Sequence, residues 1–372
     1  MKIGLIGKFN PNDKRASSGT IYSMTKALEA LNYTILWIPV SEGFLYWLYD
    51  KIIRLINKVV GKSMMALHTP LGAYLLSKSI SNKSINSCDI LFAPFASFAL
   101  YSLKTNKKII YLSDATFHLM VDYYFNPMPS FSLKYGNKVE KSAMEKSNMI
   151  ILSSDWAKNS AITKYGQNKN KIRVVEFGAN ISEGDIVFER KKYDGHLNIL
   201  FSGVDWERKG GDIAVDTVKW LNENNCKATL YVVGINDLKD EYRRLPFIKN
   251  CGFLDKNNKY EYEKFVALMK NMHCLLLPTV AECSAIVFCE ACAFGMPIFT
   301  HDTGGIRNYI KNSYNGYTLP IGSTGEDFGK TILDMVKNNN ISVMSENCRS
   351  VYENTLNWNT WALRMKSIID EL

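Results

Sequence analysis

Apolar and polar positions follow a repeated pattern along the chain, in which short apolar runs alternate with longer amphipathic stretches. Runs of four to six apolar residues are typical of strands buried in a parallel sheet, and the stretches between them have the period of a helix. In the first half this pattern predicts a helix over Thr20–Leu31 and strands at Lys2–Gly7, Tyr33–Ile38, Ile90–Ala93, Lys108–Leu112 and Met149–Leu152. Strands that alternate with helices favour a doubly wound parallel sheet.

The second half repeats the pattern more clearly. It predicts strands at Leu197–Gly203, Ala228–Gly234, His273–Pro278 and Pro297–Thr300, and helices over Asp212–Asn222, Glu261–Met272 and Ala285–Phe294. We therefore expect an α/β protein of two Rossmann-like doubly wound domains, with the polar stretch 180–196 as the hinge between them. Ligands bind outside the carboxyl ends of the strands in such sheets, so two domains facing each other across a cleft would place a site there.

Length and composition agree with this organisation. A chain of 372 residues is long enough for two or three domains, and 47% hydrophobic with 22% charged residues permits a packed core and excludes wholesale disorder. No stretch approaches the roughly 18 uninterrupted apolar residues of a membrane-spanning helix. The opening segment MKIGLIGKFN is too short in apolar residues for a signal peptide. We expect a cytoplasmic protein whose eight cysteines are reduced thiols.

The net charge of +9 is unevenly distributed. Residues 1–176 hold 23 Lys and Arg against 11 Asp and Glu, whereas the remainder holds 22 against 25. A basic first half favours an anionic partner, such as lipid head groups, a phosphorylated acceptor or nucleic acid. A solvated basic surface explains the same charge equally well, and both interpretations stay open.

One amphipathic segment of this half, Phe44–Lys62, combines apolar and basic residues. At about 100° per residue, its apolar positions cover roughly half of the helical wheel, and Asp50, Lys51, Arg54 and Lys58 lie on the other side. One interpretation is a peripheral helix that lies in the plane of an anionic membrane surface. The other is a helix whose apolar side packs on the sheet or lines an acceptor pocket.

A loop of the second half combines two cations with two glycines. In SGVDWERKGGD, which follows a strand and precedes a helix, Arg208 and Lys209 stand beside Gly210 and Gly211. A guanidinium binds phosphate oxygens in a bidentate way, an ammonium acts as a point charge, and glycines allow close approach of the backbone. The loop therefore suits a diphosphate, although an ordinary turn explains this piece when it is taken alone.

Two glutamates eight positions apart mark the next feature, AECSAIVFCEACAFGMP. With a helix that begins near Ala285, its first amides favour a phosphate, and Glu290 lies about one and a half turns further, where it could accept hydrogen bonds from a ribose. Glu282 could contact sugar hydroxyls in the same way. The alternative is a partly buried helix residue and a helix-start acid favoured by the helix dipole. The Gly-Gly turn in HDTGGIRNYI could line the same site with its amides, although an ordinary turn explains this piece better when it is taken alone.

Together these motifs resemble the donor-binding signature of retaining family-4 glycosyltransferases with the GT-B fold. The resemblance rests on the Glu-x7-Glu pattern, the following AFGMP and TGGIRNYI…NGY, the loop SGVDWERKGG, and VVEFGANI as the entry to the second domain. It covers roughly Val174–Leu319, and in the first half only the opening strand and an SSG loop match. It implies domains at 1–178 (acceptor side), 179–356 (nucleotide-sugar donor) and a C-terminal helix in 357–372 that crosses back.

The resemblance also implies roles for individual residues. Glu290 would hold the nucleotide ribose, Glu282 would contact the transferred sugar, and Lys209 and Arg208 would neutralise the diphosphate. From the first domain, Asp114, or else His118, would reach the donor sugar. The remaining donor-binding residues would be Gly19, Ser284, Ala285, Ile286, Phe253 and Leu254, with the last two at the edge of the base.

Two of the motifs depart from the family pattern. Cys283, Ser284 and Ala285 stand where the family often has Gly, an aromatic residue and Gly, and Val204 stands where many members have arginine. Ala285 is small enough for a close phosphate approach. Arg208 would substitute for the missing arginine, which leaves its division of labour with Lys209 open.

The resemblance implies a retaining hexosyltransferase of polysaccharide biosynthesis that uses a UDP- or GDP-sugar and a glycan or lipid-linked glycan acceptor. No Asp-x-Asp occurs in the sequence, so we expect no metal cofactor. The alternatives are a sugar-nucleotide epimerase or hydrolase, and a non-catalytic glycan-binding partner subunit. Nucleic-acid binding would explain the charge but none of the second-half loops.

The remaining motifs favour no other chemistry. The fingerprint G-x-G-x-x-G is absent after the first strand, which counts against an NAD enzyme, and the five histidines form no metal-ligand spacing. Cys289 and Cys292 form a C-x-x-C inside the expected helix without a second pair, so we interpret them as small buried thiols.

Overall fold

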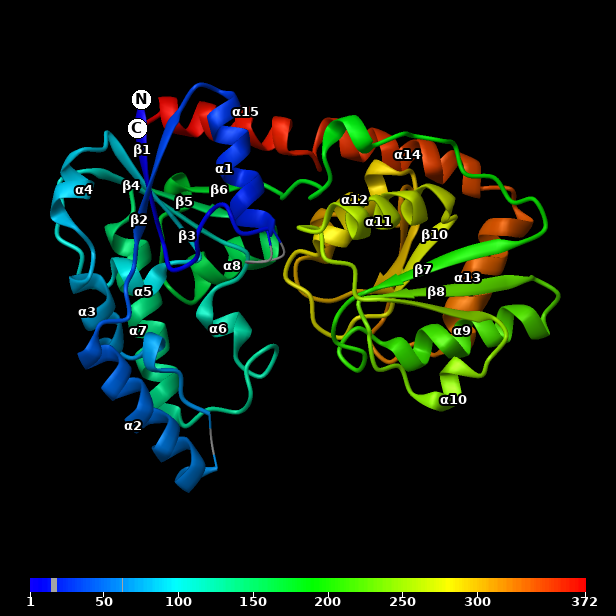
Figure 1. Ribbon diagram of the computed structural model, residues 1–372, viewed down its shortest axis with the longest axis horizontal. Helices are drawn as coiled ribbons and strands as arrows, with labels where there is room; N and C mark the ends of the chain where they lie inside the picture. The colour runs from blue at the N-terminus through cyan, green and yellow to red at the C-terminus, as the bar shows by residue number, and fades with distance from the viewer. Residues whose placement is uncertain (15–18, 62) are drawn as a thin grey trace. The chain divides into compact units, whose positions relative to one another are not determined.

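The computed structural model describes residues 1–14, 19–61 and 63–372. The chain divides into two compact units, the first formed by Met1–Val175 with Ala362–Leu372 and the second by Glu176–Trp361 (Figure 1). Ser17 and Ser18 of the predicted SSG loop, and Lys62 at the end of the predicted amphipathic helix, lie outside the described residues.

The first unit contains a six-stranded sheet in which every neighbouring pair of strands is parallel. The order is β2-β1-β3-β4-β5-β6, so the switch of direction falls between β1 and β3. The strands are β1 (Lys2–Gly7), β2 (Thr34–Pro39), β3 (Ile90–Pro94), β4 (Lys108–Ser113), β5 (Met149–Leu152) and β6 (Ile172–Val174). The helices are α1 (Thr20–Ala30), α2 (Phe44–Val60), α3 (Pro70–Lys78), α4 (Asn82–Asn86), α5 (Ser97–Leu100), α6 (Phe117–Met120), α7 (Ser130–Lys146) and α8 (Asp155–Thr163), with 3₁₀ turns η2 (Ala66–His68) and η3 (Lys169–Lys171).

The second unit repeats the architecture with a different strand order. Its sheet runs β12-β11-β10-β7-β8-β9, again parallel throughout, so the switch point lies between the central strands β7 and β10. The strands are β7 (Leu197–Ser202), β8 (Ala228–Val233), β9 (Ile248–Gly252), β10 (Cys274–Leu277), β11 (Ile298–His301) and β12 (Gly316–Leu319). The helices are α9 (Gly211–Glu223), α10 (Asp240–Arg243), α11 (Lys259–Asn271), α12 (Ile286–Ala293), α13 (Gly325–Lys337) and α14 (Ile341–Asn354), with 3₁₀ turns η4 (Glu183–Asp185) and η5 (Ile306–Asn308).

The last helix, α15 (Trp358–Asp370), begins in the second unit and continues in the first. Within the first unit, the Arg364 guanidinium donates to the carbonyl of Val174, and Arg173 pairs with Glu371 at 2.6 Å (Nη2–Oε2). The C-terminal segment is therefore held beside the end of β6.

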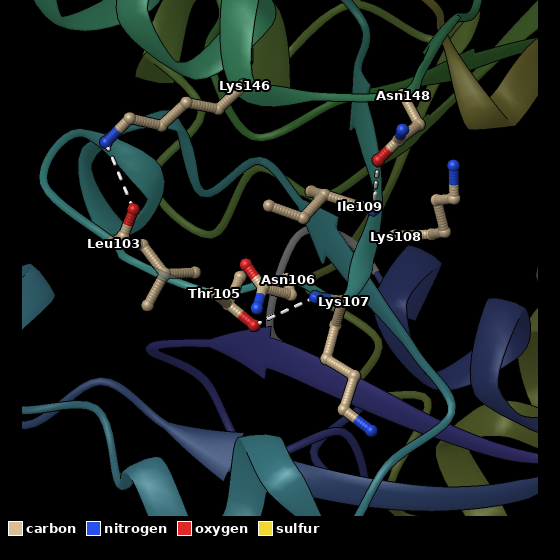
Figure 2. A pocket seen from close by; sticks show the side chains of 8 residues that line it. All are labelled: Leu103, Thr105, Asn106, Lys107, Lys108, Ile109, Lys146 and Asn148. Carbon is tan, nitrogen blue, oxygen red and sulfur yellow. Dashed lines mark hydrogen bonds between the residues drawn. The ribbon is translucent and has the colours of Figure 1, made fainter.

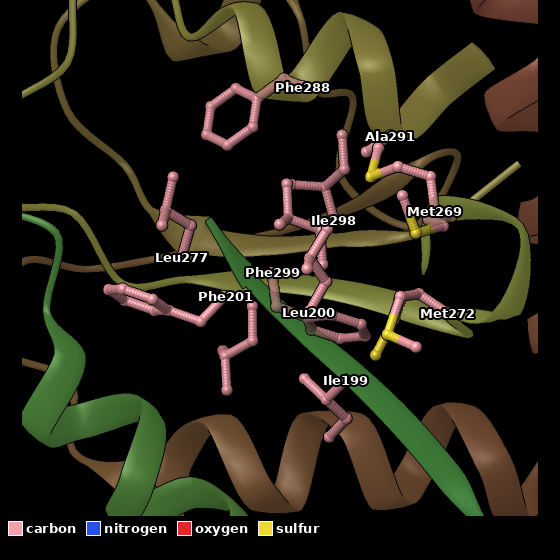
Figure 3. Packing of buried hydrophobic residues seen from close by; sticks show 14 of the residues in the cluster. Ile199, Leu200, Phe201, Met269, Met272, Leu277, Phe288, Ala291, Ile298 and Phe299 are labelled. Atoms are coloured by element: carbon pink, nitrogen blue, oxygen red, sulfur yellow. The ribbon is translucent and has the colours of Figure 1, made fainter. Parts of the chain in front are cut away.

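The core of the second unit holds its central strands in place, and the loops of the candidate site follow these strands. Side chains of β7, β10 and β11 pack against those of α11 and α12, and Leu200, Phe201, Leu277, Phe288 and Phe299 are fully buried (Figure 3). Buried apolar surface of this kind contributes about 25 cal/mol per Å² to folding. The predicted strands of both halves are present with bounds within one or two residues of those expected.

The amphipathic segment of the first unit is helical, as its pattern predicts, over Phe44–Val60. Only Tyr46 and Ile53 of this helix are buried. The interpretation in which the apolar side packs on the sheet is therefore wrong, because most of that side faces solvent. Among the described residues, no helix is both long enough and apolar enough to cross a membrane.

Candidate functional site

The carboxyl ends of β7 and β10 bring two loops of the second unit into direct contact. The backbone amide of Val280 donates to the carbonyl of Arg208 at 2.9 Å, and the Thr279 hydroxyl donates to the same oxygen at 3.1 Å. Because β7 and β10 flank the switch point of the sheet, these loops occupy the edge where parallel sheets bind ligands. The cationic loop and the glutamate loop, 73 residues apart in sequence at Lys209 and Glu282, therefore form one site.

Gly210 and Gly211 allow tight packing of the cationic loop, the first against Pro278 after β10 and the second against Trp206 of the same loop. Gly210 has a φ of +75°, and a Cβ atom there would lie 2.2 Å from the carbonyl oxygen of Pro278. A Cβ atom on Gly211 would lie 2.2 Å from the Trp206 ring. Both glycines are thus needed for the packing of protein against protein. The close approach of a phosphate to the backbone of this loop stays a prediction.

Lys209 and Glu282 form a nearly buried ion pair. The Lys209 ammonium bonds Oε2 of Glu282, and the exposed fractions of the two side chains are 11% and 7%. The stem of Lys209 lies against Gly203, where a Cβ would be 2.9 Å from Cγ. A pair of charges this deeply buried needs such mutual compensation, since either charge alone would be strongly destabilising.

The Gly-Gly turn after β11 supports Glu282. The Gly305 amide donates to the backbone carbonyl of Glu282 at 3.2 Å. This amide therefore positions the glutamate, and it does not line the site as the sequence suggested. Gly304 has a φ of +57°, which favours glycine in this turn.

Arg208 ties the two loops together. Its Nε donates to Oδ2 of Asp205 at 3.2 Å, and its Nη1 donates to the carbonyl of Ala281 at 3.0 Å. The guanidinium is 23% exposed on a side-chain basis. Arg208 thus holds the loop from Ala281 to Glu282 in place, while a part of its charge stays at the surface.

The start of α12 adjoins this ion pair. Ala285 is the N-cap and has no capping side chain, and the first turn carries no acid. The hydroxyl oxygen of Ser284 is buried, and it has no hydrogen-bond partner in the part of the chain that the structure describes. Ala285 is buried and Ile286 is half-buried. A helix N-terminus with no capping side chain and no acid in its first turn is suited to bind an anion.

Glu290, on the same helix, forms a second lysine–carboxylate pair. Its side chain is 3% exposed, and Oε1 accepts a hydrogen bond from the ammonium of Lys256, which is 26% exposed. The Lys256 ammonium also lies 4.6 Å from the ring centroid of Phe265. Sequence reasoning missed Lys256. Its only signal is its place in the loop after Gly252–Leu254, the segment expected at the edge of the base.

Phe253 and Leu254 belong to this same loop. Phe253 is 48% exposed, and its amide donates to Oδ1 of Asn236 at 2.9 Å, whereas Leu254 is half-buried against the core of the second unit. The exposed Phe253 ring is available for stacking on a flat ligand. Lys256 and Phe253 thus lie on one loop, and the contact of Lys256 with Glu290 joins that loop to α12.

The predicted first-unit residues lie at the carboxyl edge of their own sheet. Gly19, with a φ of +83°, is the N-cap of α1. Asp114 directly follows β4, and its carbonyl accepts a hydrogen bond from the Ser153 hydroxyl at 3.4 Å. His118 lies exposed on α6, and its amide donates to the Tyr165 hydroxyl at 2.9 Å. The second-unit cluster of Lys209, Arg208, Glu282, Ser284 and Glu290 is assembled within one sheet edge.

A separate pocket of about 260 Å³ lies in the first unit (Figure 2). It is at the amino ends of β4 and β5, opposite the edge at which parallel sheets bind ligands. Its polar groups bond one another: the Ile109 amide donates to Oδ1 of Asn148 at 2.9 Å, and the Lys146 ammonium donates to the Leu103 carbonyl at 3.2 Å. The side chains of Asn148 and Lys146 are therefore engaged by protein groups. Its lining residues are Leu103, Thr105, Asn106, Lys107, Lys108, Ile109, Lys146 and Asn148.

The C-x-x-C of α12 consists of free, buried thiols, as the sequence analysis predicted. Burial raises the pKa of the Cys289 thiol well above its ordinary range, and its Sγ donates to the Phe177 carbonyl at 3.3 Å. Among the described residues, no three His, Cys, Asp or Glu side chains are grouped so that they could hold a metal ion.

Two doubly wound parallel sheets, each of six strands, define the GT-B fold, which this chain has. Residues 183–358 match the model of the family described as Glycosyl transferases group 1. The matched residues lie within the second unit and include the cluster around Lys209 and Glu282.

Two curated glycosyltransferases are similar to this chain at low sequence identity. The chain is 22% identical over 237 residues to an uncharacterized glycosyltransferase of Methanocaldococcus jannaschii, with 62% of each chain covered. It is 23% identical over 199 residues to the UDP-Gal:alpha-D-GlcNAc-diphosphoundecaprenol alpha-1,3-galactosyltransferase of Escherichia coli, covering 50% of this chain and 49% of that protein. The matches thus span less than two thirds of both relatives. The crystal structure of Anabaena HepE in complex with UDP and glucose has a TM-score of 0.63 at 14% identity, with both chains covered completely.

Proposed function

We propose that this protein is a retaining, metal-independent glycosyltransferase that moves a hexose from a UDP- or GDP-sugar to a glycan or lipid-linked glycan acceptor. The observation that carries the proposal is the pair of lysine–carboxylate contacts, Lys209–Glu282 and Lys256–Glu290, on either side of the start of α12. The match to the group 1 family and the GT-B fold support it.

The two pairs explain how one site can bind both anions and hydroxyls. Without a donor, each carboxylate is neutralised by its lysine. An arriving diphosphate attracts the Lys209 ammonium and the first amides of α12. As Lys209 turns toward the diphosphate, Glu282 becomes free to accept hydrogen bonds from the sugar. The positive and negative charges of the site then stay nearly balanced, which limits the free-energy cost of burying them.

Glu290 and its loop fit the nucleoside portion. A carboxylate accepts hydrogen bonds from two adjacent hydroxyls, so Glu290 would hold the ribose while Lys256 keeps the carboxylate oriented. Phe253 and Leu254 would edge the base. In this arrangement Glu290 contributes mainly to binding, and Lys209 mainly to turnover.

Lys209 and the helix amides would act on the leaving group. The bond between the anomeric carbon and the diphosphate oxygen breaks, the bonding electrons leave with the diphosphate, and an oxocarbenium-like sugar forms. The acceptor oxygen attacks from the departing side, which retains the configuration, and its proton passes to a phosphate oxygen. Fixed cations aimed at a developing charge typically contribute ~3–4 kcal/mol each to transition-state stabilisation.

The proposed acceptor class rests on two observations. The E. coli relative is named for transfer to a sugar linked to diphosphoundecaprenol. The first half of the chain carries a large excess of Lys and Arg, which suits an acceptor that bears phosphate. We propose Asp114, with His118 as the alternative, and Gly19 as the first-unit residues that meet the donor.

A thermal-shift screen over nucleoside diphosphates and nucleotide sugars tests the proposal, because a ligand that binds only the folded protein raises its melting temperature. We expect a shift with UDP or GDP compounds, undiminished by EDTA, and a transferred sugar when a glycan acceptor is added. An epimerised sugar nucleotide formed without acceptor would replace the proposal with epimerase activity. Binding of glycan without any nucleotide would replace it with a partner subunit.

A further inference from the structure

Helix α2 is attached to the first unit along one narrow face. Tyr46 and Ile53 are its buried residues, and the Tyr49 hydroxyl donates to Oγ1 of Thr69 at 2.9 Å. Near the C-terminal end of the helix, the Asn57 side chain bonds the backbone of Met64 through both its amide nitrogen (2.8 Å) and its oxygen (2.9 Å). These contacts fix the orientation of α2, which lies along the outside of α3 (Figure 1).

A second face of α2 is apolar and exposed. At about 100° per residue, seven of its large apolar side chains fall within an arc of about 120°. Their exposed fractions are far above those of core residues: Phe44 72%, Leu45 65%, Leu48 43%, Ile52 47%, Leu55 64%, Ile56 37% and Val59 81%. A contiguous exposed apolar surface of this size marks an interaction site more often than an ordinary solvated surface.

A third face, beside the apolar one, is basic. Lys51 and Lys58 are exposed, and neither takes part in an ion pair among the described residues. Arg54 is paired with Asp50 at 2.6 Å, and Asp50 is the single acid of the helix. Trp47 lies on this flank, 50% exposed, with the Lys51 ammonium 5.7 Å from its ring.

We propose that α2 is a docking surface for an anionic lipid bilayer, in whose interface it lies with the exposed apolar face inserted. The charge of the helix selects this occupant. An anionic surface compensates Lys51 and Lys58, whereas a second copy of the chain on the same face would bring like charges together. Trp47 lies among the basic residues, and its ring stacks on that of Phe44 of the apolar face at a centroid distance of 5.8 Å. Tryptophan is enriched at membrane interfaces, where its ring can contact apolar and polar groups together.

The dimensions and the charge of the whole half agree with this occupant. A helix of 17 residues is about 25 Å long, enough for in-plane insertion along its apolar face. Residues 1–176 hold 23 Lys and Arg against 11 Asp and Glu, so the long-range field of this half also attracts an anionic surface. The inference does not depend on the proposed transferase activity.

Co-sedimentation of the whole protein with unilamellar vesicles tests the inference. Vesicles of phosphatidylglycerol and phosphatidylcholine are compared with vesicles of phosphatidylcholine alone, at 50 mM and 500 mM salt. We expect the protein to pellet with the anionic vesicles and to be released at high salt, because salt screens the attraction of the basic flank.

Two pairs of variants separate the apolar and the basic contributions. Leu55→Glu with Val59→Glu should lower the vesicle partition coefficient by about 100-fold or more, since charges replace inserted apolar groups. The matched control, Leu363→Glu with Val343→Glu, changes the same residue types at exposed helix positions, 53% and 51% exposed, and should bind as the wild type does. Lys51→Gln with Lys58→Gln should lower binding by about 25-fold, and Lys219→Gln with Lys337→Gln should not.

Several outcomes would overturn the inference. Equal recovery with anionic and neutral vesicles, or with no vesicles, would remove the anionic bilayer as the occupant. A dimer in analytical ultracentrifugation that the Leu55→Glu/Val59→Glu variant abolishes, without vesicle binding by the wild type, would assign the face to a second copy. Melting curves of every variant show whether it is folded, and nucleotide-induced thermal shifts should be equal in all of them.

Discussion

The two units bury carboxylates in different ways. In the second unit, Glu282 and Glu290 are each paired with a lysine at the carboxyl edge of the sheet. In the first unit, Glu140 on α7 is 3% exposed, and among the described residues no cation pairs with it. Its Oε1 instead accepts a hydrogen bond from the Tyr111 hydroxyl at 2.8 Å.

This difference bears on the charge of Glu140. Burial, acting against the hydrogen bonds from Tyr111 and Ser97, raises the pKa of Glu140 to about 7. A protonated carboxyl can form hydrogen bonds within a core, but it attracts cations less strongly than a carboxylate does, and it accepts fewer hydrogen bonds from hydroxyls. Glu282 and Glu290 have lysine partners that compensate a buried charge, and such partners can be exchanged for a ligand. The comparison thus separates the candidate binding edge of the second unit from a buried hydrogen-bond network of the first.

The largest expected effect is on turnover in Lys209→Ala. Loss of a fixed cation beside the leaving group should lower kcat by a few hundred-fold, which corresponds to ~3–4 kcal/mol. Steady-state kinetics with the donor found by thermal shift measures this. Lys219→Ala, an exposed lysine on α9, is the control and should be unchanged. Lys209→Ala with wild-type kcat would place the leaving group elsewhere.

The lysine also has a structural partner, so its two roles must be separated. In a double-mutant cycle with Glu282→Gln, melting temperatures report the coupling of the ion pair, and kcat reports the coupling in the transition state. We expect the stability loss of Lys209→Ala to shrink in the Glu282→Gln background, because no unpaired buried carboxylate is left. The loss in kcat should persist in that background.

The next largest effect is on the pH dependence of stability, through Glu140. Since the folded state raises this pKa from 4.5 to about 7, it binds the proton more tightly than the unfolded chain does. The contribution is complete below about pH 4.5, falls as the pH rises to 7, and totals about 3 kcal/mol. Glu140→Gln keeps an acceptor for Tyr111 and should remove this decline. Urea unfolding between pH 4.5 and 7.5 measures it.

His68 provides an internal check of that sign. Burial lowers its pKa from 6.5 to about 4, so its contribution is complete above pH 6.5 and is lost as the pH falls to 4. The slopes of Glu140 and His68 oppose each other between pH 4.5 and 6.5. We therefore expect Glu140→Gln to lose stability on acidification more steeply than the wild type, and parallel curves would contradict the assignment to Glu140.

A smaller effect is expected on nucleotide affinity from Glu290→Gln. An amide keeps one acceptor but loses the charge, so the Kd for the nucleoside diphosphate should rise by about 10- to 100-fold, in line with a charged hydrogen bond. Isothermal titration calorimetry measures it. Lys256→Gln should have a weaker effect in the same direction, because it acts through Glu290. Unchanged affinity in both variants would remove the ribose from this position.

Much of the fold could be predicted from the sequence because central parallel strands are continuous apolar runs. Leu197–Ser202 and Cys274–Leu277 are such runs, and their observed bounds differ from the prediction by one residue at an end. The short outer strands Ile172–Val174, Ile248–Gly252 and Gly316–Leu319 escaped prediction. They contain polar or glycine positions and are held by pairing with a neighbour, which a local pattern does not record.

The candidate site was predictable only where the chemistry is local. Arg208, Lys209, Glu282 and Glu290 stand in motifs whose spacing is visible in the sequence. Lys256 was missed because its contact with Glu290 spans 34 residues, and no local pattern records it. The contact of Gly210 with the Pro278 carbonyl could not be predicted, because Pro278 follows β10 and lies 68 positions away in the sequence, so that only the sheet order brings the two together.

A crystal structure of the protein with a bound nucleoside diphosphate tests the central claim most directly. The account predicts that the diphosphate lies at the first amides of α12 within hydrogen-bond distance of the Lys209 ammonium, with the ribose hydroxyls on Glu290. A diphosphate bound in another place, such as the lysine-lined pocket at the amino ends of β4 and β5, would contradict it. So would a complex in which the Lys209–Glu282 pair stays closed and touches no ligand.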